Sequence, residues 1–238
     1  MAATLALLSL TAAGCSSTRE QAAKFTQGGN RAFTAKGLRV NATNRSVKVL
    51  ERTLVTDANG TAAVVVLRNT SGRALADVPI AIAVQTAQHK VVWRNDAPGL
   101  EPGLTHAALL APGQTVTWVN DQITPSAGKP ATVKARVGAG DAAPNGAQAV
   151  RIELGAAHLE GDPASGVTAI ARATNASDVA QKNLVIAAVA RKGGRVVAAG
   201  RSIVPLLKAH GHAQFQVFFI GDPRGAALSF DAQPSTLR

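Results

Sequence analysis

The chain has very few aromatic and sulfur-containing residues. Its 238 residues include one cysteine, one methionine, two tryptophans, six phenylalanines and no tyrosine. With a single cysteine no internal disulfide can form, so any core must be stabilised by packing alone. The hydrophobic fraction of 46% is that of a globular protein. We therefore expect cores built mainly from Val, Ile, Leu and Ala.

Motifs that support catalysis or phosphate binding are also missing. The sequence contains no Gly-x-Ser-x-Gly nucleophile elbow and no Gly-x-Gly-x-x-Gly loop. A cysteine nucleophile is not expected either, because the lone cysteine has another predicted role, described below. The sequence therefore predicts a protein that is not an enzyme, with no catalytic residues and no bound cofactor.

The N-terminus begins with a short apolar leader. Residues 2–13 are apolar or small, apart from a few hydroxyl side chains, and the composition turns polar at Ser16. Such a run is shorter than the roughly 20 residues of a membrane-spanning helix and is typical of a secretory signal peptide. Its end, Ala-Ala-Gly-Cys at 12–15, resembles the lipobox of bacterial lipoproteins.

The lipobox resemblance implies a location and an anchor. It implies a signal peptide at 1–14, lipid attachment at Cys15, and an extracytoplasmic protein anchored to a bacterial membrane on its periplasmic or cell-surface face. The alternative is an ordinary signal peptide whose unpaired cysteine has no role.

The net charge of +11 is unevenly spread. Residues 15–52 contain eight Lys or Arg against two Asp or Glu, residues 53–130 contain five of each, and residues 131–238 contain twelve against seven. Residues 15–46 are polar, rich in glycine and without a sustained apolar period, so we predict a flexible basic stalk there. Beside a lipid anchor, each basic residue near the surface would add about 1 kcal/mol of attraction to anionic headgroups. A merely solvated linker is the alternative.

From Val47 onward the chain contains an internal repeat. Five segments recur in the same order, and they include two Asn-x-Ser tripeptides, at 69–71 and 175–177. The matched pairs are 47–51 with 150–154, 61–67 with 167–173, 77–85 with 183–191, 90–92 with 195–197, and 115–118 with 214–217. Five matches in order predict two copies of one domain, at 47–138 and 150–238, joined by a linker at 139–149.

The repeated segments have the two-residue period of β-strands. The even-numbered residues from Val78 to Val84 are predicted to face inward, which places Gln85 outward. In the closing segments Trp118 and Phe215 are predicted to face inward, with their polar neighbours on the solvent-compatible face. No stretch keeps a helical period for three turns.

Short alternating strands separated by Gly, Asn and Pro turns predict an all-β fold. We expect two tandem immunoglobulin-like antiparallel β-sandwiches after the signal peptide and stalk. The Asn-x-Ser segments, the alternating strand that follows them, the Lys/Arg-Val-Val hairpin and the Leu-x-Pro-Gly turn together resemble the FxLYD-type domains of bacterial envelope lipoproteins. The resemblance covers most of 47–138 and 150–238 and implies a tandem pair of such domains.

The histidines give a weak metal signal. His210 and His212 have a spacing that puts both imidazoles on one face of a strand, where they could share a metal. The pair falls in a predicted turn with no third ligand close in sequence, so polar turn residues are the better interpretation and no metal site is predicted. Basic residues between 191 and 208 are not interleaved with aromatic residues, so no nucleic-acid partner is predicted.

These observations favour a non-catalytic lipoprotein that acts as a protein-binding or scaffold module of the cell envelope. Its partners would be the membrane, through the lipid on Cys15, and an unidentified envelope protein. Two alternatives stay open. One is adhesion to anionic envelope polymers or lipid surfaces through the basic stalk and the second domain. The other is a periplasmic metal or small-ligand carrier that uses His210 and His212.

Overall fold

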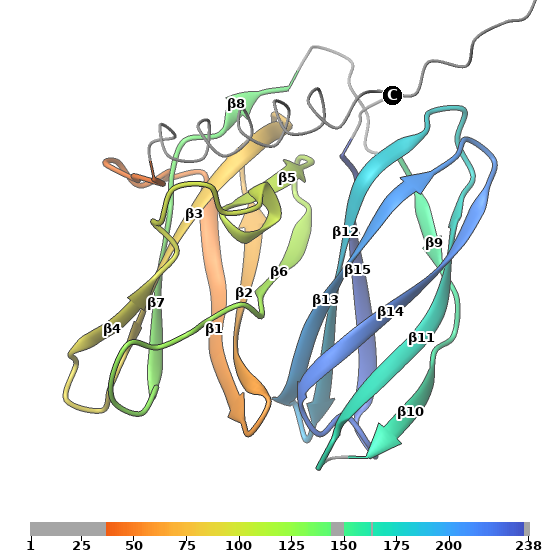
Figure 1. Cartoon of the computed structure of the whole chain (residues 1–238). Coiled ribbons are helices and arrows are strands. Elements are labelled where there is room, and N and C mark those ends of the chain that lie inside the picture. Colours follow the sequence, from red (N-terminus) through yellow and green to blue (C-terminus); the bar gives the residue numbers. More distant parts are fainter. Residues whose placement is uncertain (1–36, 144–149, 163, 236–238) are drawn as a thin grey trace, which may run out of the picture.

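The described part of the chain folds entirely into β-structure. The computed structural model describes residues 37–143, 150–162 and 164–235 (Figure 1). This part contains fifteen strands and one 3-10 helix, η1 (Pro102–Leu104), and every strand pairing is antiparallel. Within these residues, no helix has the length and apolar character needed to cross a membrane. The all-β prediction is confirmed.

The first half of the chain forms a sandwich of two sheets. The strands are β1 (Val47–Asp57), β2 (Gly60–Asn69), β3 (Leu75–Gln85), β4 (Val91–Arg94), β5 (His106–Leu110), β6 (Thr115–Asn120), β7 (Thr132–Val137) and β8 (Asp141–Ala142). One sheet has the order β1-β2-β6, and β3 is the centre of the other, with β4 and β5 along one edge and β7 and β8 along the opposite edge. Apolar side chains of both sheets meet in one buried cluster.

The second half repeats the strand neighbours of the first, with one difference. Its strands are β9 (Ile152–Leu154), β10 (His158–Asp162), β11 (Gly166–Asn175), β12 (Gln181–Lys192), β13 (Arg195–Leu207), β14 (His212–Gly221) and β15 (Ala227–Gln233). The difference is that β13 also pairs with β14, which joins these seven strands into one hydrogen-bonded sheet. Strand β11 takes the place of β2, between β14 and the pair β9 and β10. Strand β12 takes the place of β3, between β13 and β15. The internal repeat in the sequence therefore has a counterpart in strand topology.

The repeated Asn-x-Ser tripeptides have the same structural role in both halves. The Asn69 amide donates to the carbonyl oxygens of Arg73 at 2.7 Å and Leu110 at 3.0 Å, and its oxygen accepts the backbone N–H of Ser71. Asn175 makes the same three kinds of contact in the second half. Both side chains are fully buried. The Asn side chain of each tripeptide therefore forms the hydrogen bonds that backbone groups of the turn between two strands need, as short polar side chains often do.

A second repeated irregularity lies within β3 and β12. Asp77 has φ 47° and Asn183 has φ 50°, both in the left-handed region. The pairing of β3 with β5 and of β12 with β13 skips these residues. Aspartate and asparagine tolerate this region better than most residues, so the same local sequence produces the same break in both ladders.

The aromatic residues predicted to face inward do so. Trp118 is fully buried and its Nε1 donates to the carbonyl oxygen of Gly103 at 2.8 Å. Phe215 is buried and meets Phe230 edge to face, with ring centroids 5.7 Å apart. The pairings place Trp118 opposite Val65 and Phe215 opposite Ala171. Trp118 therefore occupies the position of Phe215, whereas the sequence alignment had matched it with residue 217. The alignment of this strand is off by two residues. Because side chains alternate with a period of two, the inward-facing residues stay the same.

Several outward faces are buried between the two halves, which the sequence analysis did not predict. Besides the core of each half, a separate apolar cluster joins outer residues of β1, β2 and β6 to outer residues of β12, β13 and β14; its members are Val55, Ala62, Val64, Val119, Ala187, Val189, Ala199 and Ile220. The two sandwiches accordingly lie side by side in Figure 1, with β12 and β13 next to the β1-β2-β6 sheet. This apolar interface holds the halves together.

The first sandwich extends beyond the boundaries drawn from the sequence. Residues 37–46, assigned to the stalk, lie along it, and the Asn44 N–H donates to the Val137 carbonyl at 2.8 Å. Strand β8 lies inside the predicted linker 139–149 and pairs with the start of β3. Backbone hydrogen bonds attach both segments to the sandwich. Such bonds do not require an apolar periodicity, so the sequence pattern did not predict them. Cys15, the predicted signal peptide and the rest of the stalk lie outside the described residues.

Candidate functional site

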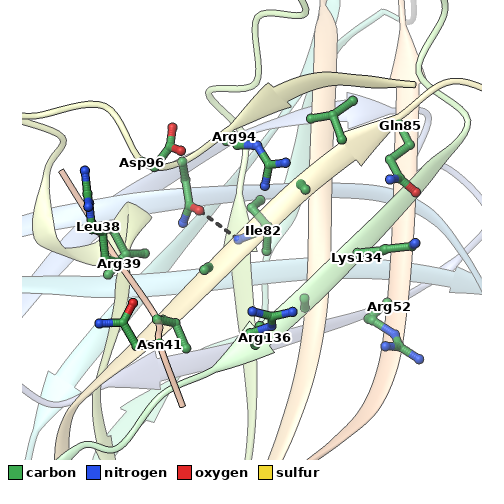
Figure 2. Close-up of a pocket in the computed structure, with 16 residues that line it drawn as sticks. Leu38, Arg39, Asn41, Arg52, Ile82, Gln85, Arg94, Asp96, Lys134 and Arg136 are labelled. Carbon is green, nitrogen blue, oxygen red and sulfur yellow. Dashed lines mark hydrogen bonds between the residues drawn. The ribbon is translucent and has the colours of Figure 1, made fainter. Parts of the chain in front are cut away.

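An open groove of about 630 Å³ lies on the outer face of the β3 sheet. Figure 2 shows Arg94 on one flank of β3 and Lys134 and Arg136 on the other. Ala81 and Ala83 of β3 form part of the floor between them. The segment 38–41, which enters the fold just before β1, lines the groove as well.

The register of the sheet explains the shape of the groove. Ala83 pairs with Arg94 on one side and with Lys134 on the other, and Ala81 pairs with Arg136. Neighbouring strands are about 4.8 Å apart, which separates the backbones of Arg94 and Lys134 by about 10 Å. Lys134 and Arg136 are two residues apart on one strand, or about 7 Å. Small floor residues and long basic flanking residues therefore produce a trough.

The groove is strongly basic. Five exposed cationic side chains line it against one carboxylate, that of Asp96; the cations are those of Arg39, Arg52, Arg94, Lys134 and Arg136. None of the five makes an ion pair with another described residue. Two such charges 10 Å apart in water repel by about 0.4 kcal/mol. A bound anion would relieve this repulsion.

Gln85, at the end of β3, also lines the groove. Its side chain was predicted to face outward, and it does lie on the outer face, yet the residue is only 6% exposed. Its Oε1 is buried and accepts no hydrogen bond from the described residues. A buried polar atom without a partner costs about 1–3 kcal/mol. A ligand that donates a hydrogen bond would recover that cost once the terminal amide turned toward the groove.

Asn95 shows the contrasting case of a fully used amide. Its oxygen accepts the Ile82 N–H at 2.7 Å, and its nitrogen donates to the carbonyl oxygens of Ile80 and Leu104 at 2.8 and 2.9 Å. The first of these bonds is drawn in Figure 2. Asn95 therefore ties the loop after β4 to β3 and fixes that wall of the groove.

The wall formed by residues 38–41 is positioned by a glycine. A Cβ at Gly37 would overlap the backbone carbonyl oxygen of Asp96, so only glycine allows the two backbones to approach this closely. Val40 packs next to Gly138 on the far side of the segment. These contacts place Arg39 beside the groove.

Two sets of buried or half-buried charged groups lie at the interface between the halves and are already paired. The Arg201 side chain is 4% exposed and binds Glu101 at 2.6 Å and Asp121 at 3.1 Å. Burial raises the pKa of Asp121 in spite of the neighbouring guanidinium. Arg191 binds Glu51 at 2.6 Å, and these hydrogen bonds lower the pKa of Glu51. These residues join the two sandwiches and leave no charge free for a ligand.

The histidines are not gathered around a metal position in the described part of the chain. His210 lies in the turn before β14, with φ 50° and its N–H bound to the Ser177 carbonyl. His212 begins β14 and lines a shallow groove of about 430 Å³ with His158 and Arg172. Among the residues that the structure describes, no three metal-binding side chains come together.

The sequence analysis missed the basic groove. It expected basic character in the stalk and the second half, whereas the five cations come from the segment before β1 and from β1, β4 and β7. The one local signal is Lys134-Ala-Arg136, whose alternation puts two cations on the same face of a strand. In the second half, Arg191 and Arg201 are neutralised by acidic residues of the first half.

Any function has to be inferred from the groove and from the residues that line it. No protein-family model matches this chain, and no curated protein matches it either.

Proposed function

We propose that this protein is a non-catalytic, lipid-anchored module of the bacterial cell envelope that binds anionic material through the groove on its first sandwich. One observation supports the ligand class above all: five exposed cations without ion-pair partners among the described residues surround an open trough. Arginine and lysine in such a setting favour carboxylate, sulfate or phosphate groups.

The anion has to be multivalent. An exposed ion pair contributes only about 0.2–1 kcal/mol, so one small anion on one arginine would bind very weakly. Several contacts made together by one molecule add up. The distribution of cations over both flanks of β3 therefore favours a polymer or an extended surface over a single small ion.

The anchor predicted at Cys15 would keep the groove near the membrane. Twenty-one residues lie between Cys15 and Gly37. Even fully extended, a segment of this length spans at most about 75 Å. The groove would then work within the layer of polymers and proteins next to the membrane. The broader proposal of a scaffold for an envelope protein is supported by the apolar interface and ion pairs that hold the two sandwiches in one arrangement.

Binding of the purified protein to an immobilised polyanion tests this proposal. We expect retention at low salt that falls steeply as ionic strength rises, because exposed charges are screened. The triple variant R94Q/K134Q/R136Q should lose most of that retention.

The matched control is the triple variant R73Q/K90Q/K208Q, which removes the same charge from exposed positions outside the groove. It should keep nearly all of the retention. Equal losses in the two triple variants would show that net charge alone is responsible, and the groove would then have no special role.

A further inference from the structure

We propose that the ligand of the basic groove is an anionic polysaccharide, that is, a linear chain of hydroxyl-bearing sugar units with acidic groups along it. This inference depends on the proposed function, since it names the class of anion that the same groove binds. Three features of the groove support it: the spacing of the cations, the unpaired Oε1 of Gln85, and the paired backbone of β3 in the floor.

The spacing of the cations favours a linear ligand. Arg94 and Lys134 are about 10 Å apart across β3, and Arg136 is about 7 Å further along. Arg39 extends the row from the segment before β1. A chain with acidic groups at intervals can meet several of these cations at once, whereas a compact anion meets one or two. Because the floor is recessed between long side chains, a flat layer of lipid headgroups would touch only their tips.

Gln85 favours a ligand that donates hydrogen bonds. The residue is 6% exposed, lines the groove, and has a buried Oε1 without a partner among the described residues. The acidic groups of a polyanion accept hydrogen bonds from the cationic side chains. They have no donor for Oε1, so this acceptor needs a ligand that also has hydrogen-bond donors. Rotation of the terminal amide toward the groove would let a sugar hydroxyl donate to Oε1 and let the amide nitrogen donate to a second hydroxyl.

The floor of the groove disfavours an acidic peptide. Extended peptides bind sheets mainly through main-chain hydrogen bonds to an open strand edge. Here β7 pairs with residues 80–85 of β3, β4 pairs with residues 83–85 on the opposite side, and Asn95 binds the backbone of Ile80 and Ile82, so the strand under the groove has no free edge. A peptide backbone laid over Ala81 and Ala83 would lose water without gaining partners. The C–H faces of sugar rings fit this surface of methyl groups.

The experiment compares polygalacturonate with polyacrylate that has the same number of carboxylates per chain, using the purified protein at fixed salt. Both polymers supply carboxylates, but only polygalacturonate has hydroxyl groups. We expect about five- to tenfold tighter binding of polygalacturonate, the scale of one satisfied hydrogen bond. Gln85→Leu should remove this preference and leave polyacrylate binding unchanged. Gln216→Leu, at an exposed position on β14, is the matched control and should change neither affinity.

Two further ligands separate the other classes of macromolecule. Tighter binding of polyglutamate than of polygalacturonate would assign the groove to an acidic protein, and tighter binding of phosphatidylglycerol vesicles would assign it to lipid headgroups; either result overturns the inference. Equal affinities for polygalacturonate and polyacrylate, unaffected by Gln85→Leu, would also overturn it and leave the proposed function standing. If no polyanion binds, the proposed function itself fails.

Discussion

Asp231 gives the sharpest test of the interface between the sandwiches. It lies on β15, and its Oδ2 accepts the backbone N–H of Thr117 at 2.6 Å across the interface. Burial raises the pKa of this carboxyl from 3.8 to about 6. Asp231→Asn keeps the shape and the acceptor oxygen but cannot ionise, so the substitution isolates the cost of the charge.

The sign and the size of the effect follow from the pKa. The folded-state pKa lies above the unfolded value, so the group stabilises the fold fully below pH 4, and this contribution is lost as the pH rises through 6. A shift of about two units, at 1.36 kcal/mol each, amounts to about 3 kcal/mol. Above pH 7 the charged carboxylate should therefore destabilise the fold by about 3 kcal/mol relative to a neutral group.

Urea unfolding of the two proteins between pH 4 and 8 measures this difference. The stability of Asp231→Asn relative to the unmodified protein should rise with pH and level off above pH 7. Comparing the two proteins cancels the effect of other carboxyls, such as Asp121, whose pKa is also raised by burial.

The control is Asp222→Asn. The hydrogen bond from Arg224 lowers the pKa of this exposed carboxyl from 3.8, so its contribution to stability is lost only on acidification below about pH 4, and Asp222→Asn should show no pH-dependent difference between pH 4 and 8. A stability difference for Asp231→Asn that does not change between pH 4 and 8 would refute the assignment.

Three further predictions concern the anchor, the core and the buried ion pairs. Cys15→Ser should release the protein from the membrane fraction or leave it unprocessed, because stable anchoring needs the lipid chains; an unchanged membrane fraction contradicts the lipobox. Trp118→Ala should cost about 3–5 kcal/mol in thermal or urea unfolding, and Gln216→Ala about 0.5 kcal/mol or less; equal costs would contradict the inward assignment. Arg201→Met should lower the free energy of unfolding by about 3 kcal/mol, because it leaves the largely buried Asp121 without its guanidinium partner, while the more exposed Glu101 can turn to water. In Arg224→Met, which breaks an exposed pair, the same unfolding measurement should change little, because water screens that pair.

Much of the fold could be predicted because strand patterns are local. The two-residue period places alternate side chains on opposite faces whatever the rest of the chain does, so Trp118 and Phe215 could be assigned inward. Two repeated pairs of residues indicated two copies of one topology. Asn69 and Asn175 each bind the backbone of a turn, and Asp77 and Asn183 each adopt the left-handed conformation within a strand.

Burial on both faces was also visible in the sequence, although it was not interpreted in that way. Strand β2 contains an almost continuous apolar run, Ala62–Leu67, and β12 contains another, Val185–Ala190. Continuous runs of this kind are typical of strands covered on both sides. The runs could have indicated that the outer faces are covered, but not which strands cover them.

The sequence by itself determined the strands, their inward faces and the twofold repeat, since these depend on neighbours within a few residues. The tertiary structure alone decided which outer face is covered and which is open. In the second half the face of β12 packs against the first half, and in the first half the equivalent face of β3 remains open and forms the basic groove. The groove joins side chains as distant as Arg39 and Arg136, and the interface pairs Glu51 with Arg191. Contacts over such separations depend on how whole sheets pack, which no local period encodes.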